Sequence, residues 1–562
     1  MIYLSIGQLE RMLSIPASTL RFWEQEVPLL MPSRTKSGRR NYSLSEVVLI
    51  ARLKHLALDK KLGLGRAQRI LEYELLYQDQ ELRANIKQLR EELFRLLLDC
   101  DRWKASLGEL IAVSTAESSV KENSVEKNLG KESLDGTDDF VDASPTPFQA
   151  IDNLTGILEA HGAIKLDERE IWQLEPGVSY YVVRGSCSLV AFRMGLKPPS
   201  ESGFLIAGAH TDSPALKIRP EKELQSRGYL RLALESYGSP ILSGWLDRPL
   251  GVAGALAVLE NKDIHQRFYI SHEPIAVIPN LAIHLNRDIN KGFEYNLSQQ
   301  LPALFGLATL NRKESESESE SEKENETASA SYSEIMMRIS QELGVDPKTI
   351  ISSDLRLYDT EPSCFFDNSL INAPRLDDLA GCAALIEAFI SVQAQASTQV
   401  ACFFDAEEIG SMTVGGAQSS YLRDVLARIT LASRSLGQDL YRALACSACV
   451  SIDGAQAWHP GYPDKFDDFY TPLLGRGIAL KSNANMNYAT DFTSRQIGHT
   501  IASKAGIKTQ LYMARADIQP GKTIGPITAS RTGVPTVDVG HPLLAMHAIR
   551  ETIAASDHLD MI

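Results

Sequence analysis

Side chains that can hold metal ions occur in five short stretches, each placed after an apolar run with the composition of a β-strand. The stretches contain His210 and Asp212, Asp377, Glu407 and Glu408, Asp453, and His547. In a parallel α/β sheet, groups at the carboxyl ends of the strands gather at one edge. Two histidines, two aspartates and one glutamate suit two Zn²⁺ ions, with Mn²⁺ or Co²⁺ as alternatives. Paired metals activate water and polarise a carbonyl, so this set predicts a hydrolase.

The adjacent acids Glu407 and Glu408 are the most informative members of the set. Like charges at the end of a buried strand repel each other in a low-dielectric setting, and a nearby cation removes that difficulty. One glutamate would then bind metal, and the other would serve as the general base. The remaining stretches are ambiguous when taken singly, because a His-x-Asp motif also occurs as a loop hydrogen bond and Asp377 or Asp378 could cap a helix.

The composition is that of a large globular protein with more than one domain. Its 562 residues exceed what one core usually holds, and 44% hydrophobic with 23% charged residues excludes a wholly disordered or collagen-like chain. The formal charge of −14 argues against a protein that coats nucleic acid or an anionic membrane. The sequence has no apolar run of the roughly 20 residues that a membrane span needs, and the first residues lack a signal-peptide pattern. Seven scattered cysteines favour reduced thiols and a cytoplasmic protein.

Beyond residue 146 the pattern is typical of an α/β protein. Apolar runs rich in β-formers, such as 204–207 and 400–404, alternate with helical stretches such as 379–392. This alternation predicts the sheet whose strand ends would carry the metal ligands.

The amino-terminal part is basic, unlike the rest. Residues 1–74 carry twelve Lys and Arg against seven Asp and Glu, which indicates two modules with different partners. Residues 1–75 contain two short helices and a basic turn at 34–42, and we interpret them as an all-α winged helix-turn-helix. Its second helix would enter a DNA major groove while the loop grips phosphate. A solvated basic face or a protein–protein module is the alternative.

Three further segments have a biased pattern. A heptad seam between residues 82 and 103 predicts that 76–105 form a dimerisation helix, although a helix packed on its own domain would also show such a seam. The polar stretch 106–139 predicts a disordered linker. The Ser-Glu repeat within 313–329 predicts an acidic low-complexity loop exposed to solvent.

The amino-terminal module resembles the DNA-binding domain of the MerR family of transcription regulators. The resemblance rests on Ser18-Thr19-Leu20-Arg21-Phe22-Trp23-Glu24 and Arg39-Arg40-Asn41-Tyr42. It implies double-stranded DNA as a partner and a following helix that pairs two subunits. The residues expected to contact DNA are Arg21, Arg39, Arg40 and Tyr42.

The region from about residue 140 onward resembles the M18 family of aminopeptidases. Among the motifs that carry the resemblance are Asp247-Arg248-Pro249-Leu250-Gly251, Ala282-Ile283-His284-Leu285-Asn286-Arg287 and Thr523-Ile524-Gly525-Pro526-Ile527. The resemblance implies an α/β/α peptidase domain of residues 140–215 and 361–562. An inserted β-rich dimerisation domain would occupy residues 216–360. It also implies a homo-oligomer built of dimers, typically a dodecamer.

The same resemblance assigns the metal ligands. One metal would be held by His210, Asp377 and Asp453, and the other by Asp377, Glu408 and His547. Asp377 would therefore bridge the two.

It also assigns the residues around the metals. Glu407 would be the general base and Asp212 would orient His210. His284 would reach the active site of a neighbouring subunit and stabilise the tetrahedral intermediate.

The choice of substrate is less determined. A peptide whose first residue is acidic needs a cation in the pocket, and Lys481, Arg515 and Lys522 are the candidates, with Lys481 the predicted contact. Plain structural roles for these side chains and a preference for neutral first residues both remain open.

Together these features predict a cytoplasmic aminopeptidase with two divalent metals, peptide substrates, a DNA-binding head and no membrane association. The alternative is a MerR-like regulator whose peptidase-like domain only senses peptides or metals. The intact ligand set with an intact base favours the enzyme, because a retired enzyme tends to lose one of them.

Overall fold

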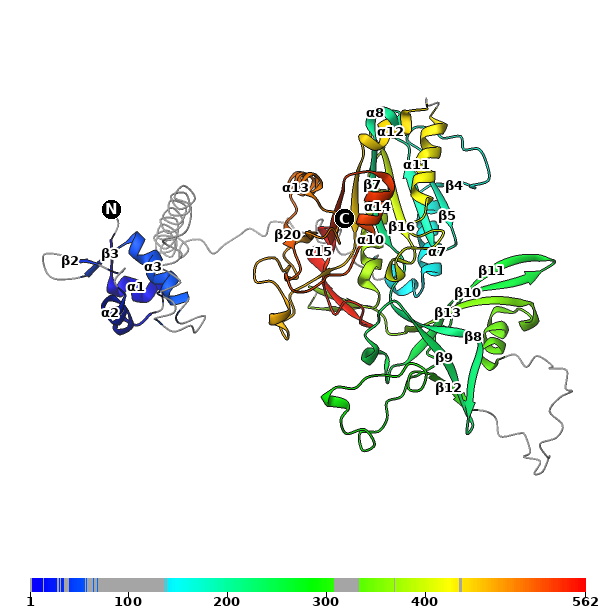
Figure 1. Cartoon of the computed structure of the whole chain (residues 1–562), viewed down its shortest axis with the longest axis horizontal. Helices are drawn as coiled ribbons and strands as arrows, with labels where there is room; N and C mark the ends of the chain where they lie inside the picture. The colour runs from blue at the N-terminus through cyan, green and yellow to red at the C-terminus, as the bar shows by residue number, and fades with distance from the viewer. Residues whose placement is uncertain are drawn as a thin grey trace, which may run out of the picture. The chain divides into compact units, whose positions relative to one another are not determined.

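The computed structural model describes residues 3–13, 15–27, 30, 32–34, 40–55, 57, 64, 68, 137, 139–307, 333–367, 369–433 and 437–562. The chain divides into two compact units, Met1–Glu122 and Asn123–Ile562, each considered by itself (Figure 1). Several predictions fall outside the described residues: the dimerisation helix 76–105, Arg39, the loop 313–329, and the linker 106–139 except for 137 and 139.

The described part of the amino-terminal unit is a small mixed module of helices and strands (blue in Figure 1). Its elements are β1 (Tyr3–Ser5), α1 (Ile6–Leu13), α2 (Ala17–Glu26), β2 (Ser33–Arg34), β3 (Arg40–Ser43) and α3 (Leu44–Lys54). The strands form an antiparallel sheet in the order β1-β3-β2. Leu9, Leu20, Trp23 and Ile50 are among the side chains that form its core.

The prediction of an all-α module is therefore wrong. Leu4 of β1 lies opposite Tyr42 of β3, and both side chains are buried in the core. A strand of three residues is too short to show the alternation that identifies strands in a sequence, so its pairing depends on contacts distant along the chain. Helix α3 begins where local chemistry predicts, because Ser43 and Glu46 form a reciprocal capping box.

A mixed sheet forms the centre of the second unit. Its strand order is β20-β19-β21-β17-β7-β16-β6-β5-β4. The bounds are β4 (Ile164–Lys165), β5 (Ser179–Arg184), β6 (Ser188–Arg193), β7 (Phe204–His210), β16 (Thr398–Phe404), β17 (Ala448–Ile452), β19 (Ile478–Lys481), β20 (Thr509–Tyr512) and β21 (Thr536–Gly540). Strands β16, β7, β17 and β21 are mutually parallel neighbours, so their carboxyl ends share one edge.

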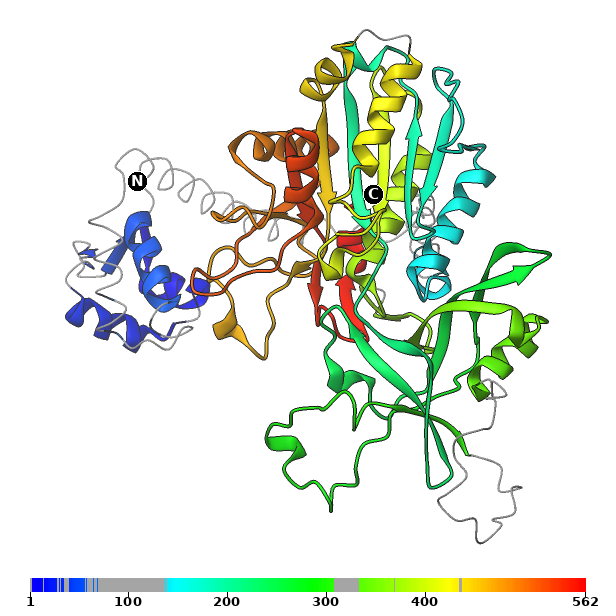
Figure 2. The same cartoon turned by 45° about the vertical axis from the view of Figure 1, so that its right-hand side comes forward.

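Helices cover both faces of this sheet, which gives the predicted α/β/α layers (Figures 1 and 2). Alternate residues of β16 point to opposite faces, since Val400 and Cys402 belong to one core cluster while Ala401 and Phe403 belong to the other. The helices are α7 (Pro147–Ala160), α8 (Pro199–Ser202), α10 (Leu376–Ser391), α11 (Tyr421–Ala432), α12 (Asp439–Ala445), α13 (Phe492–Ala505), α14 (Ile524–Thr532) and α15 (Ala555–Leu559). Helices α7 and α10 contribute to the first core, and α11 and α12 to the second.

Two further sheets complete the unit. The first, in the order β14-β15-β23-β22-β18, comprises β14 (Cys364–Phe366), β15 (Leu370–Ala373), β18 (Ala455–Gln456), β22 (Pro542–Leu544) and β23 (Glu551–Ala554). The second, in the order β11-β10-β13-β8-β9-β12, comprises β8 (Ala215–Ser226), β9 (Tyr229–Tyr237), β10 (Leu250–Glu260), β11 (Asp263–Ile270), β12 (Ala303–Leu307) and β13 (Ile350–Asp359), with α9 (Glu334–Leu343) beside it. This green sheet has a separate apolar core and meets α7, where Gln149 donates to the carbonyls of Gly254 and Tyr269 (Figure 2).

Short 3₁₀ turns link these elements, namely η3 (Leu242–Trp245), η4 (Ile289–Lys291), η5 (Pro347–Thr349), η6 (Glu407–Ile409) and η7 (Pro463–Lys465). In the part of the chain that the structure describes, no helix has both the length and the apolar character needed to cross a bilayer.

Candidate active site

Acidic and histidine side chains from distant parts of the chain meet at the carboxyl edge of the central sheet. His210 is the last residue of β7, Asp453 follows β17, and η6 with Glu407 and Glu408 follows β16. Asp377 lies at the start of α10, and His547 lies in the loop between β22 and β23. The parallel order of the strands thus brings together side chains that are up to several hundred residues apart.

Two overlapping groups of these side chains have the spacing of metal ligands. One group is His210, Asp377 and Asp453, and the other is Asp377, Glu408 and His547. In each group, one ligand atom per residue lies within 4.8 Å of the others. Asp377 belongs to both groups. Its Oδ1 is 3.6 Å from Nε2 of His210, and its Oδ2 is 3.9 Å from Nε2 of His547.

The ring nitrogens of both histidines are oriented by backbone carbonyls. Nδ1 of His210 donates to the carbonyl oxygen of Asp212 at 2.9 Å, and Nδ1 of His547 donates to that of Ser239 at 3.2 Å. In each case Nε2 is left facing the carboxylates, on the side where a metal ion could bind. Nε2 of His547 lies 3.4 Å from Oε1 of Glu408.

The donor set fits divalent cations on electrostatic grounds. Burial, the largest cause, acts together with neighbouring carboxylates and against His210 to raise the pKa of Glu407 to about 8 and that of Glu408 to about 10. Burial also raises the pKa of Asp453, while Lys481 opposes that rise. Carboxylates so closely packed are stabilised by multivalent positive charge, and a mixture of imidazole and carboxylate donors suits Zn²⁺.

Asp212 contacts the Glu407–Glu408 turn more closely than it contacts His210. Its Oδ1 accepts from the backbone N–H of Glu407 at 3.0 Å, and its Oδ2 accepts from that of Glu408 at 3.1 Å. The Tyr237 hydroxyl donates to Oδ2 at 2.9 Å, whereas Oδ1 is 3.5 Å from Nδ1 of His210. The carboxylate therefore holds the backbone of the two glutamates, and the carbonyl of the same residue orients the histidine.

Asp378 has a different position from its neighbour. It is fully buried, and its Oδ2 accepts from the backbone N–H of His210 at 3.2 Å. It thus supports the end of β7 and is absent from both groups with metal-ligand spacing.

A cavity of about 390 Å³ opens over these side chains. Besides the candidate ligands it is lined by residues that include Gln456, Tyr488, Tyr512, Lys522 and Met546. A concave, partly apolar site of this size with convergent polar groups is typical of a small-substrate pocket.

The three candidate cations have different surroundings. Lys481 is only 2% exposed, and its ammonium donates to Oδ1 and the carbonyl of Asp453 and to the carbonyl of Gly454. Arg515 pairs with Asp517 and does not line the cavity. Lys522 lines the cavity, is exposed, and forms no hydrogen bond or ion pair within the described residues.

His284 is exposed and lies outside the lining of this chain's cavity. The prediction that it serves a neighbouring subunit stays a prediction.

In the amino-terminal unit the predicted DNA contacts differ in accessibility. Arg21 is exposed on α2, while Nε of Arg40 pairs with Oε2 of Glu24 at 2.6 Å. Tyr42 is fully buried and its hydroxyl donates to Glu24. The prediction that Tyr42 contacts DNA is therefore corrected: it anchors β3 to α2 from within the core.

Two residues of the site were missed by sequence reasoning, Tyr237 and Glu551. Glu551 accepts hydrogen bonds from the backbone N–H groups of Asp377 and His547. The spacing of four residues between His547 and Glu551 was a local signal, but nothing in the sequence indicated the link to Asp377.

In comparisons with known proteins, two separate parts of the chain match two different families. The family model described as Aminopeptidase I zinc metalloprotease (M18) matches residues 140–562. A second, described as MerR HTH family regulatory protein, matches residues 4–74.

Individual relatives match over most of the chain. The "Probable M18 family aminopeptidase 2" of Ectopseudomonas mendocina (strain ymp) is 37% identical over 431 residues, which are 76% of this chain and 96% of that protein. The "Cryo-EM structure of the Ape4 and Nbr1 complex" matches with a TM-score of 0.72 and 32% identity, over 79% of this chain and 86% of that one. The "Structure of S. cerevesiae mApe1 dodecamer" matches with a TM-score of 0.65 and 26% identity, over 77% and 95%.

Proposed function

We propose that this chain, which belongs to the M18 family of zinc metallo-aminopeptidases, removes the first residue of peptides with two divalent metal ions in the pocket described above. One ion would be held by His210, Asp377 and Asp453, and the other by Asp377, Glu408 and His547. The observation that carries the proposal is the position of Asp377, whose two oxygens face two different histidines. Zn²⁺ suits these donors, and Mn²⁺ or Co²⁺ are the alternatives.

Divalent ions at this place supply a Lewis acid for the peptide carbonyl and lower the pKa of an attacking water. Glu407 is the general base in this proposal. Its carboxylate borders the cavity, and within the described residues no group donates a hydrogen bond to it, so it is available to take a proton from water and pass it to the leaving amine. Asp212 keeps that carboxylate in place by binding the backbone of the glutamate turn.

We extend the proposal to acidic first residues, with Lys522 as the cation that receives the substrate's side chain. The ammonium of Lys481 already has three acceptors and is buried, so its role in the proposal is to hold Asp453. Lys522 lines the same cavity and is unpaired within the described residues. A single exposed cation of this kind discriminates only modestly between acidic and neutral first residues, because water screens its charge.

The test is the release of the first residue from matched peptides that begin with Asp, Glu or Leu. The protein is expected to cleave unblocked peptides, to spare N-acetylated ones, and to lose activity after chelation until Zn²⁺, Mn²⁺ or Co²⁺ is restored. Lys522→Ala is expected to lower kcat/KM for Asp- and Glu-peptides by about 10-fold, which corresponds to about 1.4 kcal/mol, with little change for Leu-peptides. Lys504→Ala, an exposed lysine on α13, is the control. Equal losses on all three peptides would show that Lys522 does not recognise the charge of the first residue.

The amino-terminal unit is proposed to bind double-stranded DNA through α2. The support is the MerR match over residues 4–74 together with the exposed Arg21 on α2, a helix that Glu24 joins to β3. The second candidate function, a regulator that uses its peptidase-like domain as a sensor, rests on the same match. The dodecamer structure of a similar protein and the predicted role of His284 favour a homo-oligomer. We also propose that the protein is cytoplasmic.

DNA binding can be measured with the full-length protein on random-sequence duplexes at several salt concentrations. Arg21→Ala is expected to weaken binding about 10-fold and to make the dependence on salt shallower, because one cationic contact is lost. Lys197→Ala, which removes an exposed charge from the peptidase unit, should leave affinity unchanged. A wild-type protein that binds no duplex at low salt would refute the DNA-binding proposal, and a protein that binds DNA but cleaves no peptide would favour the sensor.

A further inference from the structure

We propose that Glu551 is a positioning residue that holds two of the metal ligands, Asp377 and His547, in register with each other. The inference rests on the proposed metal site and deepens it. The ligand motifs gave no indication of Glu551. It is absent from the lining of the cavity over the candidate metal ligands and from both groups with metal-ligand spacing.

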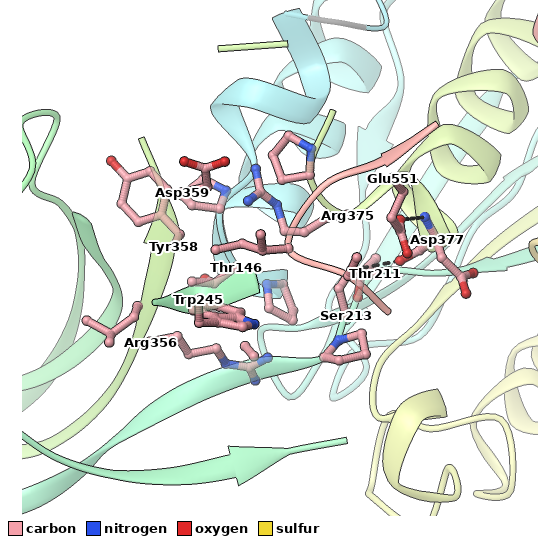
Figure 3. Close-up of a pocket in the computed structure, with 18 residues that line it drawn as sticks. Thr146, Thr211, Ser213, Trp245, Arg356, Tyr358, Asp359, Arg375, Asp377 and Glu551 are labelled. Carbon is pink, nitrogen blue, oxygen red and sulfur yellow. Dashed lines mark hydrogen bonds between the residues drawn. The ribbon is translucent and has the colours of Figure 1, made fainter. Parts of the chain in front are cut away.

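The contacts of Glu551 are specific. Its Oε2 accepts from the backbone N–H of Asp377 at 2.8 Å, and its Oε1 accepts from the backbone N–H of His547 at 2.7 Å. Figure 3 shows the first of these bonds as a dashed line between Glu551 and Asp377. Asp377 lies 174 residues away in the sequence. The Glu551 carboxylate thus links Asp377, which belongs to both groups, to His547 of the second group.

The backbone needs external support at one end of this link, His547, and close to the other end, at Arg375. His547 has φ +66° and Arg375, two residues before Asp377, has φ +58°, which is the left-handed region that residues with a Cβ rarely adopt. Such conformations persist when the surrounding structure determines them. The hydrogen bond that Glu551 accepts from the backbone N–H of His547 contributes to that determination, and the Ser213 hydroxyl donates to the carbonyl of Asp377 at 2.9 Å.

The anchor itself is rigid. Glu551 begins β23, which pairs with β15 so that Glu551 lies opposite Ala373. The side chain is 2% exposed. Next to it, Arg550 binds Asn372 and Asp359 and fixes the strand to two other elements.

A carboxylate suits this position better than any neutral side chain. Two N–H groups converge on it, and only a carboxylate offers an acceptor oxygen to each. Its charge adds to an already acidic cluster, which is a cost that burial increases. Asp212 has the same arrangement at the glutamate turn, with one oxygen for each backbone N–H.

Glu551→Gln tests the inference, because it keeps the shape but offers one acceptor and turns an amide N–H₂ toward a backbone N–H. Metal-free protein is titrated with Co²⁺, and binding is followed by the visible absorption of the ion and by the metal content after gel filtration. We expect the wild type to bind two ions and the variant to bind one of them about 10- to 100-fold more weakly. At saturating Co²⁺ we expect kcat to recover substantially and KM to stay at the wild-type value.

Glu159→Gln, which alters a carboxylate on α7 that accepts from the Tyr181 hydroxyl of β5, is the matched control and should bind both ions normally. Wild-type Co²⁺ affinity in folded Glu551→Gln overturns the inference and leaves the proposed function standing. A wild type that binds no Co²⁺ overturns both. If Glu551→Gln does not fold, Glu551→Asp decides: it keeps the charge but is one methylene too short to reach both N–H groups, so an unchanged affinity in that variant overturns the inference as well.

Discussion

Glu407→Gln is expected to lower kcat by about 10²- to 10⁴-fold, with little change in KM. The amide has the shape of the carboxylate but cannot take a proton from water. No other described group lies in the same position: Glu408 faces His547, and Asp212 is occupied by backbone N–H groups and Tyr237. The loss should therefore appear in the chemical step, as measured by single-turnover release of the first residue.

The metal content of Glu407→Gln shows whether the loss of kcat comes from the missing general base or from lost metal. Glu407 is outside both groups with metal-ligand spacing, so Glu407→Gln should bind the same number of ions as the wild type. Asp152→Asn on α7, an exposed carboxylate, controls for the change of charge. A variant that retains both ions and a wild-type kcat would remove Glu407 from the mechanism.

Asp377→Asn is expected to abolish both metal binding and peptide cleavage, with a loss of activity at least as large as that of Glu407→Gln. Asp377 is the residue shared by the two groups, and an amide can neither bridge two cations nor supply the negative charge that they require. The measurement is metal content after dialysis, followed by activity across a range of added Zn²⁺. A partial variant such as His547→Gln should instead lose one ion.

This comparison separates a bridging ligand from an ordinary one. If Asp377→Asn kept one ion with full affinity, Asp377 would belong to a single site and the two-metal proposal would fail. Circular dichroism should show the wild-type fold, since among the described residues the one hydrogen bond that Oδ1 of Asp377 accepts is long, 3.4 Å from the backbone N–H of Gly454.

Much of the central sheet was predictable because its signals are local. The run 400–404 was recognised as a strand from its composition, and it forms β16 with alternate side chains in two separate cores. The same holds for the site: polar residues placed after apolar strands converge whenever those strands are parallel neighbours, as β7, β16 and β17 are. The candidate ligands could therefore be named before their distances were known.

Other predictions failed where the deciding contacts are long-range. Strand β1 has three residues and depends on pairing with β3, so an all-α head was the natural but wrong prediction. Tyr42 lies beside a basic turn in the sequence, yet the pairing of β3 turns its ring into the core. That Lys481 contacts an acidic substrate stays a prediction, and the structure adds that three acceptors surround its ammonium.

The order and types of residues determined that two modules of opposite charge exist and that one contains a hydrolase-like set of ligands. Those conclusions depend on composition and on short-range periodicity, which any stretch of chain expresses by itself. Folding decided which carboxylate lies between two histidines, which lysine keeps a free ammonium, and that Glu551 ties Asp377 to His547. These are properties of distance and burial, and both arise only when strands far apart in the sequence pack into one sheet.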